Sequence, residues 1–167
     1  MNLVYIETSH QYNLYKSYAN NDHTDTVIFT NNLALYRSHK SELLFIDLKG
    51  YGWELITSIT KCLILSKSYY ESITGNWLTN YTGMILYNCL NFNTAYLLED
   101  GIGTPVILKS PYFYSTFKHR LKFFIIRILL ILLSGGRVLN FVVPTFFSAV
   151  ISTFPLKIKN NFVRTNL

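Results

Sequence analysis

The chain has 167 residues, of which 50% are hydrophobic and 14% are charged. The length fits one ordinary domain, and the large apolar share excludes an intrinsically disordered chain. Lys and Arg number 15 against 9 Asp and Glu, and no acidic residue follows Asp100. This basic later part favours an anionic partner such as a phosphate, a membrane surface, an anionic glycan or a nucleic acid, with a solvated basic face as the alternative.

The first half of the chain predicts strands that alternate with helices. Short β-branched and apolar runs indicate the strands, and polar capping residues followed by apolar residues at helical spacing indicate the helices. The predicted strands are residues 2–6, 27–29 and 43–48. The predicted helices are one that begins near Ser9 and ends at residues 20–22, and one at residues 54–66.

The second half continues the same alternation. The predicted strands or extended pieces are residues 71–74, 94–98, 106–108 and 138–143. The predicted helices are residues 82–90 and 117–133, the latter stopped by Ser134-Gly135-Gly136. Because strand and helix alternate at least four times, we expect an α/β fold in which a parallel sheet has helices on both faces.

The N-terminus and the cysteines indicate a cytoplasmic protein. The N-terminus has no basic segment, and its apolar run is interrupted at Glu7, unlike a secretory signal peptide. Cys62 and Cys89 lie on apolar stretches without metal-ligand spacing, which is typical of buried free thiols in a reducing compartment. No pair of histidines has the spacing of a helical metal site.

Two late apolar segments offer a membrane alternative. Residues 123–133 contain Arg127 and are shorter than the roughly 20 residues of a membrane-spanning helix. Residues 141–154 are also apolar but contain Pro144. A membrane hairpin or anchor made of residues 123–154 is therefore the alternative to a globular fold here.

The chain's adjacent acidic pair, Glu99-Asp100, has the strongest chemical potential. It follows the apolar strand at 94–98 and precedes Gly101. Ligands of doubly wound α/β folds bind beyond the carboxyl ends of the strands, and a glycine there allows close approach of the backbone. Paired carboxylates can serve in proton transfer. A plain Asp-Gly turn is the alternative interpretation.

The run Ala95 to Thr104, with Glu99-Asp100-Gly101 at its centre, resembles the acidic-acidic-glycine motif of bacterial sialyltransferases, in particular polysialyltransferases and lipooligosaccharide sialyltransferases. The opening strand and residues 8–12 are similar to that family's first strand and Thr-Pro-x-Gln-Tyr-like turn, with Ser9 where proline is usual. Gly75-Asn76 and residues 152–155 are similar to further family segments. The resemblance spans most of the chain.

This resemblance implies a Rossmann-like domain that forms the N-terminal half of a GT-B glycosyltransferase. Glu99 would be the general base that deprotonates the acceptor hydroxyl, Asp100 would support it, and Gly101 would allow close approach. Ser9, Gln11 and Asn76 would contribute to substrate binding. The reaction would be an inverting, metal-independent transfer of sialic acid from CMP-sialic acid, without a cofactor, to an anionic or neutral acceptor glycan of a capsule or lipooligosaccharide.

The chain departs from this family in its second half. The family's donor contacts lie in a second domain with a His-Pro motif, and this chain has no His-Pro dipeptide. We therefore expect residues 1–155 to form the acceptor-side domain and residues 156–167 to begin an interdomain linker. The chain alone would then be a poor enzyme without its C-terminal domain, and a non-catalytic remnant is the alternative.

Charged residues near position 120 suggest further partners. Lys118, Arg120 and Lys122 suit an anionic acceptor glycan or the inner face of the cell membrane, where peripheral contact is expected. His10 suits either a helix-capping region or a place facing the cleft. Nucleic acid is not expected as a partner because no motif for it is present.

Overall fold

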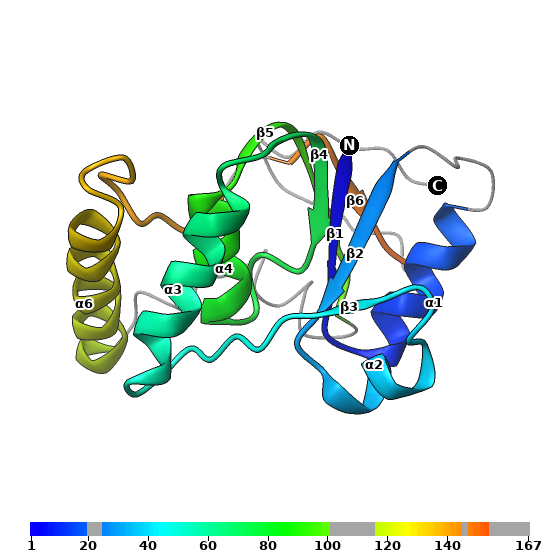
Figure 1. The fold of residues 1–167 in the computed structure, drawn as a ribbon, viewed down its shortest axis with the longest axis horizontal. Coiled ribbons are helices and arrows are strands. Elements are labelled where there is room, and N and C mark those ends of the chain that lie inside the picture. The colour runs from blue at the N-terminus through cyan, green and yellow to red at the C-terminus, as the bar shows by residue number, and fades with distance from the viewer. Residues whose placement is uncertain (20–24, 101–115, 145–146, 154–167) are drawn as a thin grey trace.

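The computed structural model describes residues 1–19, 25–100, 116–144 and 147–153, which form a six-stranded, all-parallel sheet flanked by helices (Figure 1). The strands are β1 (Asn2–Ile6), β2 (Thr26–Thr30), β3 (Leu44–Phe45), β4 (Tyr69–Gly75), β5 (Asn91–Leu98) and β6 (Ala149–Ile151). The helices are α1 (Ser9–Tyr18), α2 (Leu33–Ser38), α3 (Glu54–Leu65), α4 (Tyr81–Cys89) and α6 (Phe117–Leu133). The predicted parallel α/β sheet is confirmed.

The strand order is β3-β2-β1-β4-β5-β6. The chain builds outward from β1 to β3, then crosses to β4 on the other side of β1 and builds outward again. This is the order of a Rossmann-like, doubly wound sheet, and its direction of winding reverses between β1 and β4. Ligands of such sheets bind near that reversal, at the carboxyl ends of the strands.

The two faces of the sheet carry separate cores. In β1, Leu3 and Tyr5 belong to a core shared with α3, α4 and α6, whereas Val4 and Ile6 belong to a core shared with α1 and α2. Successive side chains of a strand point to opposite faces, so a central strand with helices on both faces is apolar throughout. Figure 1 shows the two helical layers, with α6 outermost beside α3.

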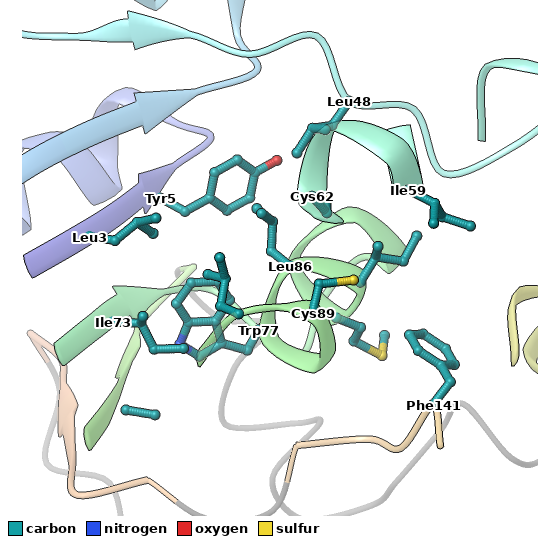
Figure 2. Packing of buried hydrophobic residues seen from close by; sticks show 14 of the residues in the cluster. Leu3, Tyr5, Leu48, Ile59, Cys62, Ile73, Trp77, Leu86, Cys89 and Phe141 are labelled. Carbon is teal, nitrogen blue, oxygen red and sulfur yellow. The ribbon is translucent and has the colours of Figure 1, made fainter. Parts of the chain in front are cut away.

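Trp77 fixes the loop after β4 within the larger core (Figure 2). Its side chain is fully buried, and its indole nitrogen donates to the backbone carbonyl of Tyr96 over 2.8 Å. Its ring stacks near that of Tyr5, with 6.3 Å between the centroids. The carboxyl ends of β1, β4 and β5 are thereby tied to one another through one side chain.

Two predicted strands are corrected by the structure. Residues 43–48 form only the two-residue strand β3, because its neighbour β2 ends at Thr30, which pairs with Phe45. Residues 138–143 form no strand; the backbone of Val142 instead bonds to the side chain of Asn88, at 2.8 and 3.0 Å. The edge beside β5 is occupied by β6, which the sequence did not predict, and α2 was also missed.

The remaining predicted elements that lie in the described residues are confirmed within a few residues. The helix at 117–133 has the predicted bounds, and Gly135 and Gly136 end it with positive φ angles of 61° and 84°. Their amides donate to Leu132 and Ile131, a helix stop that requires a left-handed residue after the cap. The extended piece at 106–108, the first helix's stop at 20–22 and the linker at 156–167 lie outside the described residues.

The late apolar segments take part in the fold. Phe123, Ile126 and Leu130 of α6 are buried in the larger core, and residues 149–151 form β6, the edge strand beside β5. Among the described residues, no helix is both long enough and apolar enough to cross a membrane.

Candidate functional site

Polar side chains collect where the parallel strands end. Glu7 follows β1, Asn31 follows β2, Asn76 follows β4, Glu99 and Asp100 follow β5, and Ser152 and Thr153 follow β6. The carboxyl ends of parallel strands meet at one edge of a sheet, so these residues share that edge. Two of them, Glu99 and Glu7, each form the centre of a separate hydrogen-bond cluster.

The Glu99 cluster joins the start of α1 to the ends of β5 and β6. The Glu99 side chain is fully buried, and its carboxylate accepts hydrogen bonds from the Ser152 hydroxyl and from the Thr153 backbone amide over 2.8 Å. The Thr153 hydroxyl lies 3.3 Å from both carboxylate oxygens. A buried carboxylate needs such donors, because burial without them disfavours the charged form strongly.

His10 is the exposed member of the Glu99 cluster. Its Nε2 atom lies 3.8 Å from Oε1 of Glu99, and its side chain is 46% exposed against 0% for Glu99. The first turn of α1 holds it there through a capping box, in which Thr8 and Gln11 cap each other's backbone amides. Of these two side chains, His10 is the one that can exchange a proton with solvent, because the carboxylate of Glu99 is shielded from it.

Asp100 connects the Glu99 cluster to the loop before α4. The Thr79 hydroxyl donates to Oδ2 of Asp100 over 3.4 Å. In the same loop, Oδ1 of Asn76 accepts from the backbone amides of Leu78 and Thr79, at 3.3 and 3.2 Å. The end of β5 and the β4–α4 loop are thus held together by side-chain hydrogen bonds.

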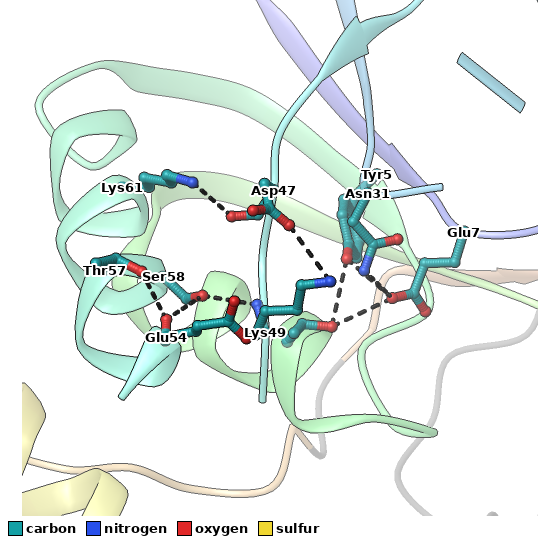
Figure 3. Close-up of polar contacts among 10 residues, drawn as sticks. Tyr5, Glu7, Asn31, Asp47, Lys49, Glu54, Thr57, Ser58 and Lys61 are labelled. Atoms are coloured by element: carbon teal, nitrogen blue, oxygen red, sulfur yellow. Dashed lines mark hydrogen bonds and ion pairs between the residues drawn. The ribbon is translucent and has the colours of Figure 1, made fainter. Parts of the chain in front are cut away.

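The Glu7 cluster lies where the ends of β1 and β2 meet the start of α4 (Figure 3). Its carboxylate accepts from the Tyr5 hydroxyl over 2.9 Å, from the Asn31 amide over 3.3 Å, and from the Thr82 hydroxyl over 3.2 Å. The Asn80 side-chain amide also donates to it. Burial raises the pKa of Glu7, and the charge of Asp100 adds to that rise, while these hydrogen bonds oppose it.

A pocket of about 450 Å³ opens beside the Glu7 cluster. Its lining residues come from the ends of β1 and β2, the loop before α3, the first turn of α4 and one side of α6: Glu7, Asn31, Lys49, Tyr51, Thr79 and Lys122 are among them. Thr79 links this pocket to Asp100. The pocket therefore adjoins the acidic pair, although the sequence analysis did not predict it.

The predicted binding residues fall in different places. Ser9 is exposed at the start of α1. Gln11 is buried: its Oε1 accepts from the backbone amide of Glu7 over 2.7 Å, and its Nε2 has no hydrogen-bond partner among the described residues. Nδ2 of the buried Asn76 also has no such partner there. Gly101 lies outside the described residues.

Lys122 of α6 lines the pocket. Its ammonium lies 3.7 Å from the centre of the Tyr81 ring, a cation–π contact that joins α6 to α4. Tyr81 also bonds through its hydroxyl to Nδ1 of His119, at 2.7 Å. Partial burial and the neighbouring Lys118 lower the pKa of Lys122.

Neither cysteine belongs to this edge of the sheet. Both are buried free thiols, as predicted, and burial raises the pKa of Cys89 to about 12. A thiol with so high a pKa is a poor nucleophile at neutral pH. Both cysteines contribute to the apolar core instead (Figure 2).

The turn between β1 and α1 is unsuited to a dinucleotide, although the strand order matches that of dinucleotide-binding sheets. Such sheets carry glycines here, and the pyrophosphate lies on free amides of the helix N-terminus. This turn has no glycine, begins with the carboxylate of Glu7, and its amides are engaged by Thr8 and Gln11. A phosphate would meet negative charge and occupied donors.

No family model, curated protein or solved structure matches this chain. The chemistry must therefore be inferred from the site itself. The Glu99 cluster pairs a buried carboxylate with an exposed imidazole, an arrangement suited to proton transfer. The Glu7 cluster offers amides, hydroxyls and a carboxylate next to a pocket, an arrangement suited to a ligand rich in hydroxyl groups.

The sequence predicted Glu99 and Asp100 but not Glu7, Asn31, Asn80 or Thr82. The sequence does contain one signal for two of the missed residues. Asn80 and Thr82 stand at the start of a predicted helix, where capping side chains are expected. Nothing in the sequence joins them to Glu7. Only the adjacency of β1 and β4 does so.

Proposed function

We propose that this chain is the acceptor-side domain of a sialyltransferase-like glycosyltransferase with two Rossmann-like domains. The proposed reaction transfers sialic acid from CMP-sialic acid to an acceptor glycan of a capsule or lipooligosaccharide, with inversion at the anomeric carbon. Donor contacts would come from a second domain. The proposal rests on the sequence resemblance and on one structural observation.

That observation is the meeting of distant segments at the acidic pair Glu99-Asp100. The segments that carry the resemblance are residues 8–12, Gly75-Asn76, the acidic pair and residues 152–155. His10, Ser152 and Thr153 all lie against Glu99, and Asp100 is bonded to the loop that begins at Asn76. Residues chosen from sequence alone therefore share one edge of the sheet, which supports a common role.

In the proposed reaction, Glu99 and His10 act as a pair. The acceptor hydroxyl oxygen forms the bond to the anomeric carbon while the bond from that carbon to the CMP phosphate oxygen breaks. The hydroxyl proton passes to the imidazole of His10, and the carboxylate of Glu99 stabilises the resulting positive charge. The proton then leaves to solvent. Because Glu99 is fully buried, it takes part in proton removal through His10.

The test is transfer of sialic acid from CMP-sialic acid to glycan acceptors, measured on the full gene product. We expect Glu99→Gln to lower kcat by about 10²- to 10⁴-fold, the usual range for loss of acid–base catalysis. His10→Asn should give a loss of similar size. Glu42→Gln is the matched control, because Glu42 pairs with Lys16 on the surface.

The outcomes separate the roles clearly. Unchanged transfer by both Glu99→Gln and His10→Asn would reject this assignment of the proton acceptor. If Glu99→Gln lowers kcat and His10→Asn does not, Glu99 is itself the base and His10 takes no part in the mechanism. Absence of sialic acid transfer by the wild-type gene product would reject the proposed reaction.

A further inference from the structure

Helix α6 carries a second apolar face that the core does not cover. Its inner side, with Phe123, Ile126 and Leu130, is buried. Six of its exposed large apolar residues are Phe117 (81% exposed), Leu121 (47%), Phe124 (59%), Ile125 (46%), Ile128 (40%) and Leu132 (70%). At 3.6 residues per turn these six positions fall within an arc of about 100°, directly opposite the buried side. We call this arc the outer stripe.

Basic residues border the outer stripe on both sides. On the same helical projection, Arg120 and Arg127 lie along one border and Lys118 and Lys122 along the other. Helix α6 contains no acidic residue, and none follows it in the chain. An exposed apolar stripe with cations on both borders is the pattern of a helix that lies in the interface of an anionic membrane.

The place of α6 in the fold makes the outer stripe accessible. Figure 1 shows α6 as the outermost helix, on the far side of α3 from the sheet. Its inner face is fixed against the protein, so the helix can present only the opposite side to a surface. The 17 residues of α6 make a helix about 26 Å long, which would lie along that surface.

The charges favour a membrane over a second copy of this chain. In a symmetric dimer through the outer stripe, identical patches would face each other, and the cations of both copies would come together without acidic partners on either helix. An anionic bilayer instead supplies negative headgroups at the borders and an apolar interior beneath the stripe.

We propose that the outer stripe of α6 binds the surface of an anionic lipid bilayer, with its apolar residues among the acyl chains and the exposed Lys118, Arg120 and Arg127 at the headgroups. This docking does not depend on the chemistry of the carboxyl edge. The apolar residues of the stripe and the two arginines are exposed, so they can be substituted with little effect on the core.

The test is sedimentation of the purified chain with lipid vesicles. We expect binding to vesicles that contain phosphatidylglycerol, weak binding to phosphatidylcholine alone, and a loss of binding as salt is raised. The double variant Arg120→Gln, Arg127→Gln should bind about 25-fold more weakly, at about fivefold for each cation near a charged surface. Phe124→Ser with Ile128→Ser should abolish binding.

The control is Tyr69→Ser, which removes another exposed aromatic, 67% exposed, at the start of β4 and away from α6. It should bind vesicles as the wild type does, and circular dichroism should show that all variants are folded. Failure to bind phosphatidylglycerol vesicles at low salt would overturn the proposal. Vesicle binding by the Phe124→Ser, Ile128→Ser variant would also overturn it. So would a dimer of the wild type that forms without lipid and is lost in that variant.

Discussion

Glu7 and Glu99 lie at the same edge of one sheet and are surrounded differently. The carboxylate of Glu99 is held by a backbone amide and two hydroxyls from the short segment after β6, with an imidazole on its solvent side. The carboxylate of Glu7 is held by neutral side chains from several elements and borders an open pocket. The imidazole beside Glu99 fits the proton transfer proposed above, whereas the contacts of Glu7 join β1, β2 and α4.

The largest difference between Glu7 and Glu99 is expected when each carboxylate is removed. Glu7→Ala should lower the free energy of unfolding by about 3 kcal/mol, because the four side chains that donate to this carboxylate each lose a hydrogen bond. Glu99→Ala should cost about 1 kcal/mol, because the exposed Thr153 can turn to water. Urea unfolding of both variants checks the order, with the surface variant Glu42→Ala as control. Equal costs would contradict the division of roles.

A substitution away from both acids should disturb the Glu7 side and leave the contacts of Glu99 with α1 and β6 in place. A Cβ atom at Gly83 would lie 2.2 Å from the backbone oxygen of Asn76, so the first turn of α4 would have to move away. Gly83→Ala should therefore cost about 2 kcal/mol, a typical penalty for overpacking. The amide signals of Asn31 and Thr82 should shift in NMR spectra, while those of His10 and Thr153 should stay in place.

A substitution in the cap of α1 should disturb the Glu99 side instead. Thr8→Ala removes the cap that accepts from the Gln11 amide at 3.2 Å and holds the first turn of α1. We expect a loss of about 1 kcal/mol in unfolding free energy. The matched control is Ser38→Ala, whose exposed hydroxyl bonds only within α2. Hydrogen exchange of the first α1 amides should rise in Thr8→Ala and stay unchanged in Ser38→Ala.

The smallest expected effect is a pH dependence that belongs to Glu7. Its pKa is raised in the folded state, so the native protein binds this proton more tightly than the unfolded chain does. The contribution is fully present below the ordinary pKa of a glutamate and is lost as pH rises through the raised value. Compared with Glu7→Gln, the wild type should therefore gain stability as pH falls from 7 toward about 4.5. Urea midpoints across that range measure the difference.

Glu99 could be predicted from the sequence because local signals surround it. An apolar strand precedes it and a glycine follows its acidic neighbour, so its position at a strand end is visible in the sequence. Glu7 also follows a strand, but its partners Asn80 and Thr82 reach it only because β4 crosses over to pair with β1. That crossover depends on packing across the whole sheet and leaves no local pattern.

The wrongly predicted strands also result from contacts between distant segments, which leave no local pattern in the sequence. Residues 138–143 have strand-like composition, yet the Asn88 side chain satisfies the backbone of Val142, and the sheet edge is taken by a segment of three residues. The length of β3 depends on where its neighbour β2 ends. In contrast, the stop of α6 was predictable because two adjacent glycines supply the left-handed turn by themselves.

Lys122 belongs both to the border of the outer stripe and to the wall of the pocket. A membrane beneath α6 would therefore lie beside the pocket, and a glycan attached to a lipid could enter it while its anchor stayed in the bilayer. Its search for the site would then take place in two dimensions instead of three. The ammonium that rests on the Tyr81 ring at 3.7 Å would stand at the point where that path leaves the membrane and enters the protein.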